Sequence, residues 1–180
     1  MLFRSQGLPG LLRLSCSGST GPHVQSLEGL QQLTNLQTLD LSGNAVQDLT
    51  ALSGLLRLQT LDLSDNQITV VKPLSGAIAL DRLTLSGNRI SDPRPLQALP
   101  ALTMLDIAGN RITDASRLAG CPMVNELWLG GNPLTDVAAL VLMPSLKGVD
   151  LAGLDQPRVT GVPVLQHKGV YVGGQASGRG

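Results

Sequence analysis

Aromatic residues are nearly absent from this chain of 180 residues, making up 2% of it as Phe3, Trp128 and Tyr171. Most globular cores contain several rings, because each buries about 150–250 Å². Hydrophobic residues nevertheless account for 42% of the chain, so nearly all of them are aliphatic. We therefore expect one domain with a core of leucine, valine, isoleucine and alanine.

The chain also lacks a charge imbalance, since 13 basic and 13 acidic residues cancel. Nucleic acids and anionic membrane surfaces select for clustered Lys and Arg, so neither kind of partner is expected. No apolar run approaches the roughly 18 residues that would span a bilayer. A signal peptide ending at Cys16 is the less favoured interpretation of the N-terminus, because Gly10 and Arg13 interrupt its apolar stretch.

Repetition with a period of 22 residues is what the sequence has in abundance. LQTLDLSGNAVQDL at 36–49 recurs as LQTLDLSDNQITVV at 58–71, and further blocks keep aliphatic residues at the first, fourth and sixth positions. The blocks begin at Leu36, Leu58, Leu80, Leu102, Val124 and Leu146. Because positions four and six are two residues apart, each block is predicted to start with a short strand. One block alone buries too little apolar surface to fold, so the blocks must stack in register.

Polar residues recur at two further positions of the block. The ninth position carries the predicted structural asparagine ladder, Asn44, Asn66, Asn88, Asn110 and Asn132. A stacked asparagine both donates and accepts, so it can satisfy backbone groups at a buried bend. At the thirteenth position, Asp48, Asp92, Asp114 and Asp136 are expected to cap a helical turn.

The pattern resembles the leucine-rich repeat, in the 22-residue form of bacterial internalins and of a regulatory subunit of protein phosphatase 1. The block LDRLTLSGNRISDPRPL at 80–96 shows LxxLxLSGNxIxDxxxL almost whole. The resemblance implies an α/β fold, a right-handed leucine-rich repeat solenoid shaped as an arc or horseshoe, with a parallel β-sheet on its concave face. Short 3₁₀ turns and loops are expected on the convex face, where recurrent prolines argue against long helices.

The predicted repeat domain covers residues 11–172 in about seven turns. These are 11–35, 36–57, 58–79, 80–101, 102–123, 124–145 and 146–170. The end turns are irregular, with an insertion at 20–23 and a shift of three residues before Val159. We expect 1–10 to be an extension or weak cap, 170–172 a last short strand and 173–180 a disordered tail.

Cysteine and histidine are scarce, with two of each, and such a stack keeps them apart. Cys16 and Cys121 lie four turns apart, about 19 Å and beyond disulfide reach. His23 and His167 are separated by about 29 Å, so no serine has a paired base. HExxH, CxxC and GxxxxGK[ST] are missing. We expect no catalytic residue, no metal and no cofactor, and the lack of a disulfide slightly favours a cytoplasmic protein, although localisation stays open.

Two further charged features are interpreted as surface. Asp40 and Asp62 fall on neighbouring strands about 5 Å apart, but Ca²⁺ takes roughly six to eight oxygens, so a metal site is the weaker alternative to a solvated strand face. Arg89 and Arg111 each precede an aspartate by three residues and are expected to form weak exposed pairs with it.

Third- and fifth-position side chains should point outward from the concave sheet, and there Trp128 stands where most blocks have Asp or Thr. Tryptophan, methionine and arginine are the residue types enriched at interface hot spots. The predicted partner-binding patch consists of Arg82, Thr84, Met104, Asp106, Glu126 and Trp128. The alternative is that Trp128 lies against its neighbours and only shields the sheet.

A sheet of seven strands is about 34 Å long, which suits a macromolecular partner better than a small molecule. We therefore hypothesise a non-catalytic protein–protein interaction module that binds a protein of unknown identity on the concave face. The alternative hypothesis is a structural or spacer repeat segment, or a fragment of a larger multidomain protein. The sequence leaves the oligomeric state open.

Overall fold

The computed structural model describes residues 10–18, 23–154 and 159–174. The expectations for the N-terminal extension at 1–9, for 20–22 of the insertion and for 175–180 of the tail lie outside the described residues.

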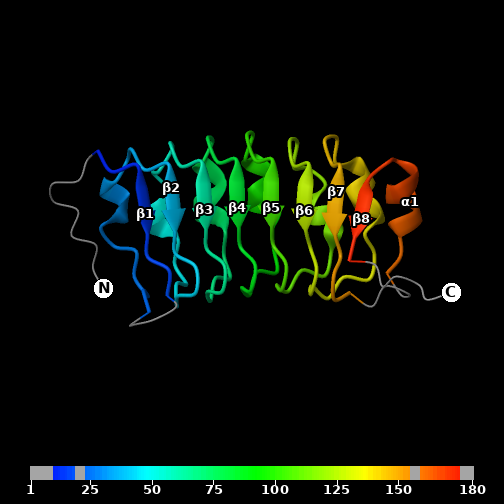
Figure 1. The fold of residues 1–180 in the computed structure, drawn as a ribbon, viewed down its shortest axis with the longest axis horizontal. Coiled ribbons are helices and arrows are strands. Elements are labelled where there is room, and N and C mark those ends of the chain that lie inside the picture. Colours follow the sequence, from blue (N-terminus) through cyan, green and yellow to red (C-terminus); the bar gives the residue numbers. More distant parts are fainter. Residues whose placement is uncertain (1–9, 19–22, 155–158, 175–180) are drawn as a thin grey trace.

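The described residues form a single open sheet of eight parallel strands in chain order (Figure 1). The strands are β1 (Arg13–Ser15), β2 (Thr38–Asp40), β3 (Thr60–Asp62), β4 (Arg82–Thr84), β5 (Met104–Asp106), β6 (Glu126–Trp128), β7 (Gly148–Asp150) and β8 (Tyr171–Gly173). From β2 to β7, paired residues are 22 apart, as in Leu39↔Leu61. The parallel register predicted from the period is therefore confirmed.

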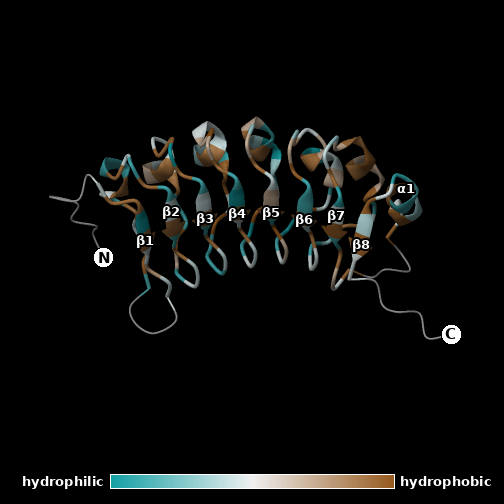
Figure 2. Ribbon diagram, turned by 45° about the horizontal axis from the view of Figure 1, so that its top comes forward, coloured by the Kyte–Doolittle hydropathy of each residue, from teal (hydrophilic) through white to brown (hydrophobic). Residues whose placement is uncertain are grey.

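Short helical turns cover the other side of the stack. The 3₁₀ turns are η1 (Leu30–Gln32), η2 (Thr50–Leu52), η3 (Lys72–Gly76), η4 (Arg94–Ala98), η5 (Ala115–Leu118) and η6 (Ala138–Leu142). Figure 2 shows a shallow arc, with these turns on its outer side and the strands on its inner side. The predicted solenoid is confirmed by the parallel sheet, the 3₁₀ turns and the arc that they form together.

The last turn contains a short α-helix, α1 (Val162–His167), where a 3₁₀ turn or loop was expected. Pro163 stands in its first turn, where a missing N–H costs nothing because that donor has no intrahelical partner. Val162 and Leu165 are buried and join the core from this helix. The proline therefore starts this helix instead of preventing it.

The core is one continuous column of aliphatic side chains that runs from Val24 to Val172. The middle residue of each strand from β2 to β8 points into it, while its two neighbours face outward. Leu39, Leu61 and Leu105 are completely buried. No aromatic ring of the described residues enters this core.

The five ladder asparagines lie buried in one column and connect adjacent turns. Asn88 is typical: its Nδ2 donates to Leu63 O of the preceding turn at 2.9 Å and to Leu85 O of its own turn at 3.0 Å. Its Oδ1 accepts from the Ile68 N–H at 2.9 Å. Each asparagine therefore satisfies backbone groups that the stacked bends would otherwise leave unpaired in the interior.

The residue before each asparagine has a left-handed backbone. It is glycine in most turns, with φ of 67° at Gly43 and 68° at Gly87. Asp65 is the exception among the described residues, a non-glycine at φ 53°. Side chains disfavour this region, which explains why Ser-Gly-Asn recurs in the sequence.

Two surface expectations need correction. β8 begins at Tyr171, one residue later than the predicted strand, and ends at Gly173, one residue into the predicted tail, where the Leu151 N–H donates to Gly173 O at 3.2 Å. The ion pairs expected between Arg89 and Asp92 and between Arg111 and Asp114 are also wrong.

Among the described residues, Asp92 and Asp114 are paired instead with arginines inside the helical turns. Asp92 lies 2.7 Å from Arg94 and 3.5 Å from Arg117, and Asp114 lies 3.4 Å from Arg117. Arg94 lies in η4 and Arg117 in η5, and Arg117 joins aspartates of two adjacent turns.

Candidate functional site

The six residues of the predicted patch lie together on three adjacent strands, β4, β5 and β6. Strand register forms them into two rows on the concave face. The first row pairs Arg82 with Met104 and Met104 with Glu126, and the second pairs Thr84 with Asp106 and Asp106 with Trp128. Because this register places neighbours about 4.8 Å apart, the patch is a contiguous surface.

Contacts within the patch partly immobilise its cation. The Arg82 guanidinium donates from Nη1 to the Met104 sulfur at 3.4 Å, and its Nε lies 3.8 Å from the Asp81 carboxylate. All three side chains remain at least partly exposed. Exposed pairs of this kind contribute under about 1 kcal/mol, so Arg82 stays available to a partner.

Asp106 has a structural contact besides its place in the patch. Its Oδ1 accepts from the Ala108 N–H at 3.0 Å, and Asp40, Asp62 and Asp150 make the same contact two residues ahead. The carboxylate therefore supports the bend that follows the strand. Aspartate at the fifth position is accounted for by local backbone geometry, without a metal.

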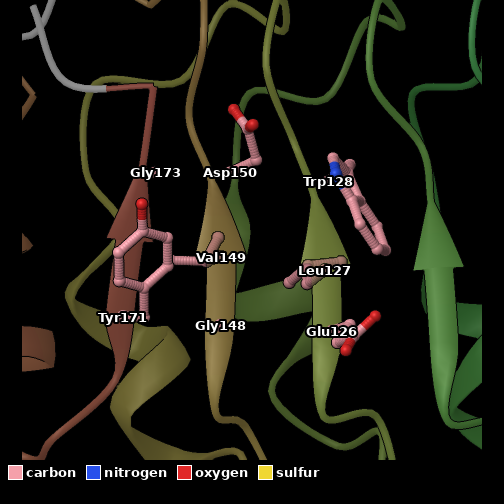
Figure 3. A pocket seen from close by; sticks show the side chains of 8 residues that line it. All are labelled: Glu126, Leu127, Trp128, Gly148, Val149, Asp150, Tyr171 and Gly173. Carbon is pink, nitrogen blue, oxygen red and sulfur yellow. The ribbon is translucent and has the colours of Figure 1, made fainter.

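Trp128 is partly buried, less open than a ring standing free on a sheet. Figure 3 shows its indole leaning away from β7, toward the neighbouring strand on the β5 side. Asp106 is its register partner there. The ring partly covers the sheet and is also partly exposed to solvent. Its position is compatible with both interpretations of Trp128, a binding residue and a shield for the sheet.

Tyr171, which the sequence analysis left out of the site, is the most exposed large hydrophobic side chain of the described residues, at 75%. It stands on β8 in register with Gly148 of β7. Its position was hidden because the shift of three residues in the last turn breaks the 22-residue count. Counting from Val172 as the buried fourth position would have placed Tyr171 at an outward third position.

A hollow of about 270 Å³ opens on the concave face between Glu126 and Tyr171 (Figure 3). It is lined by Glu126, Leu127, Trp128, Gly148, Val149, Asp150, Tyr171 and Gly173. The hollow exists because Gly148 has no side chain at an outward position of the central strand. It extends the candidate surface from β6 to β8.

Neither cysteine has the features of a nucleophile. Burial raises the pKa of the Cys121 thiol to about 11. Burial, followed by the nearby Asp40 charge, also raises the pKa of Cys16. A raised pKa disfavours the thiolate, which is the nucleophilic form of cysteine.

Over 10–18, 23–154 and 159–174, no helix is long and apolar enough to cross a membrane. In the same residues, no three or more His, Cys, Asp or Glu side chains gather as metal ligands would.

The stacked asparagines, the parallel sheet and the outer 3₁₀ turns define a leucine-rich repeat protein. The family model for leucine-rich repeats matches residues 34–90 and 57–112. No curated protein matches the chain significantly.

Three solved structures show what the chain is similar to. An internalin, InlF of Listeria monocytogenes, is 25% identical with a TM-score of 0.80, over 94% of this chain and 49% of its own. Internalin C2 of the same bacterium is 30% identical with a TM-score of 0.71, over 91% of this chain and 80% of its own. The plant peptide hormone receptor RGFR1, in complex with RGF2, shares the fold at 23% identity and a TM-score of 0.65, over 81% of this chain and 25% of its own.

The chain belongs to the leucine-rich repeat family, and its repeats are of the internalin-like class. It spans about half the length of the InlF structure. Proteins of this family are typically protein–protein interaction modules.

Proposed function

We propose that the chain is a non-catalytic module that binds a protein partner on its concave face. The observation that carries this proposal is the open concave face of the sheet, where Trp128 is partly exposed and Tyr171 is exposed. Exposed rings on a sheet contribute little to their own fold but bury large area in a complex.

Charge and chemistry along the patch support the same proposal. Arg82, Met104 and Trp128 lie within three strands, and these residue types are over-represented where interfaces bind tightly. The family is one of binding proteins, and the plant receptor RGFR1 was solved in complex with RGF2, although that likeness is one of fold. The partner's identity is not part of the proposal.

The test compares wild type with Trp128→Ala. Each protein is immobilised, partners are captured from the native host, and the captured partner is purified and titrated against both. We expect Kd to rise about thirtyfold, the effect of losing a hot spot worth about 2 kcal/mol. The variant should fold, because Thr84 and Asp106 hold the same outward place on β4 and β5.

Leu142→Ala is the matched control. Leu142 is 70% exposed on η6, on the convex side, so its truncation also removes exposed apolar area. Its Kd should stay within twofold of the wild type. Equal Kd values for Trp128→Ala and wild type would remove the patch around Trp128 from the interface.

A further inference from the structure

The hollow on the concave face is bounded by two rows of side chains. In the first row, Glu126 pairs with Gly148 and Gly148 with Tyr171. The outer two residues are therefore about 9.6 Å apart, two strand spacings, with no side chain between them. A Cβ built on Gly148 would meet no atom within 4 Å, so the floor of the hollow is open space.

The second row brings a carboxylate to the same hollow. Asp150 pairs with Trp128 on one side and with Gly173 on the other. A Cβ built on Gly173 would lie 3.5 Å from Tyr171 Cε1 and 3.6 Å from Asp150 Oδ2. Because glycine leaves that point empty, the carboxylate oxygen and the ring edge border one small space.

The two carboxylates of the hollow have no cationic partner within the described chain. No ion pair joins Glu126 or Asp150 to a basic side chain of the described residues. Asp150 uses Oδ1 for the Ala152 N–H at 2.7 Å, which leaves Oδ2 toward the hollow. The ammonium of Lys168 is bound elsewhere, to Val141 O at 2.6 Å.

The surrounding sheet is acidic as well, although the whole chain is neutral. The outward positions of the eight strands carry five acidic residues and two basic ones. The acidic residues are Asp40, Asp62, Asp106, Glu126 and Asp150, and the basic ones are Arg13 and Arg82. Such a face attracts a cation and repels an anion.

We propose that this hollow receives one cationic side chain, an arginine or a lysine, of the protein partner. This inference rests on the proposed function and names the chemistry of that partner. Asp150, with Glu126 on the strand beside it, supplies the opposite charge. Tyr171 borders the hollow with its ring edge and turns its ring face to solvent at the rim (Figure 3), so a cation that enters there meets that face. At about 270 Å³ the hollow lies near the lower end of the roughly 300–1,000 Å³ of small-molecule sites, and it has room for one side chain.

The first experiment titrates isotope-labelled protein with acetyl-arginine amide and, separately, with acetyl-citrulline amide, its neutral isostere. We expect saturable chemical-shift changes at the Gly148 and Gly173 amides with the arginine probe, weakened by added salt. The citrulline probe should bind at least about fivefold more weakly, because the charge is missing. Equal shifts with both probes, or no saturable shift, would overturn the proposal.

The second experiment fills the hollow with Gly148→Thr. Threonine already occupies the equivalent place in β2 and β3, as Thr38 and Thr60, so the variant should keep its fold and its free energy of unfolding. We expect at least a tenfold rise in Kd for the arginine probe. Thr60→Val, three strands or more from the hollow, is the matched control and should leave Kd unchanged.

The double variant Glu126→Gln, Asp150→Asn removes charge and keeps shape, since the amide introduced on β7 retains an oxygen that can accept from the Ala152 N–H. It should weaken arginine binding about as much as Gly148→Thr, and unaltered binding would count against the proposal.

Titration of the purified partner separates this inference from the proposed function. If Gly148→Thr binds the partner like wild type while Trp128→Ala does not, the cationic pocket is refuted and the concave interface stands. If Gly148→Thr weakens the partner while Trp128→Ala does not, the pocket is supported and the patch around Trp128 is refuted.

Discussion

At the scale of single residues, the asparagine column explains why the repeats cannot separate. Asn88 links the backbones of two adjacent turns, since it accepts from the Ile68 N–H and donates to Leu63 O of the preceding turn and to Leu85 O of its own. Since all five asparagines are buried, water cannot replace these bonds. The stack is therefore connected by hydrogen bonds on its inside as well as by strand pairing.

Asn88→Ala should lower the free energy of unfolding by about 3 kcal/mol, because it leaves several buried backbone groups without partners. Urea unfolding followed by circular dichroism measures this. Asn125→Ala on the sheet face is the matched control, since no hydrogen bond to its side chain is found in the described chain, and it should cost well under 1 kcal/mol. A similar loss in both variants would contradict the structural role of the ladder.

At the scale of elements, carboxylates organise the helical turns. The Oδ1 of Asp48, Asp92, Asp114 and Asp136 accepts from the backbone N–H two residues later, at the start of η2, η4, η5 and η6. A 3₁₀ turn leaves its first N–H groups without partners, so each aspartate supplies one. The predicted N-cap is confirmed at Asp114 of η5. Asp48, Asp92 and Asp136 stand one residue before the N-cap residue of their turns and make the same contact with the backbone.

Acid should weaken these turns. Hydrogen bonds from the Arg94 guanidinium lower the pKa of Asp92 from 3.8 to about 2. Because the folded pKa lies below the unfolded one, unfolding takes up a proton; the contribution of Asp92 is complete above pH 3.8 and is lost as the pH falls toward 2. Bonds from Thr50 and Ser116 shift the pKa of Asp48 and Asp114 in the same direction.

The measurement is the free energy of unfolding in urea from neutral pH down to pH 2. Asp92→Asn should show a shallower fall than wild type across the acid range. Glu28→Gln, which removes an exposed carboxylate from the first turn, is the control and should follow the wild-type curve. An unchanged slope in Asp92→Asn would mean that the Arg94 pair is absent in solution.

At the scale of the whole molecule, the central turns repeat the same structure and each contacts only its neighbours, so a whole central turn should be removable. Deleting residues 80–101 joins Ala79 to Leu102 and keeps the remaining strands in register. We expect a folded protein whose urea m-value falls roughly in proportion to the surface lost.

Deleting residues 80–90 is the control for that experiment. It removes half a turn, so the residues after the deletion no longer have strand positions beside strands and helical-turn positions beside helical turns of the preceding turn. We expect this variant to lose cooperative unfolding. If both deletions unfold alike, the turns are not independent units.

The sequence analysis agrees with the structure for those contacts that the 22-residue period determines. The period determines which residues pair, because Leu61 must lie beside Leu39 and Leu83 once the turns stack. The six patch residues could be placed on adjacent strands for the same reason. Tyr171 was expected in a last short strand, but its outward direction and its place at the site were not predicted, because the irregular last turn breaks the count between β7 and β8.

The sequence by itself determined the solenoid, the buried asparagine column and the outward rows, since a repeated pattern of burial has one consistent stacking. Only the tertiary structure decided that Trp128 leans toward β5, that Arg117 pairs with Asp92 and that Gly148 leaves a hollow beside Tyr171. Those features depend on side-chain direction and on the absence of atoms between neighbouring strands, neither of which a one-dimensional period records.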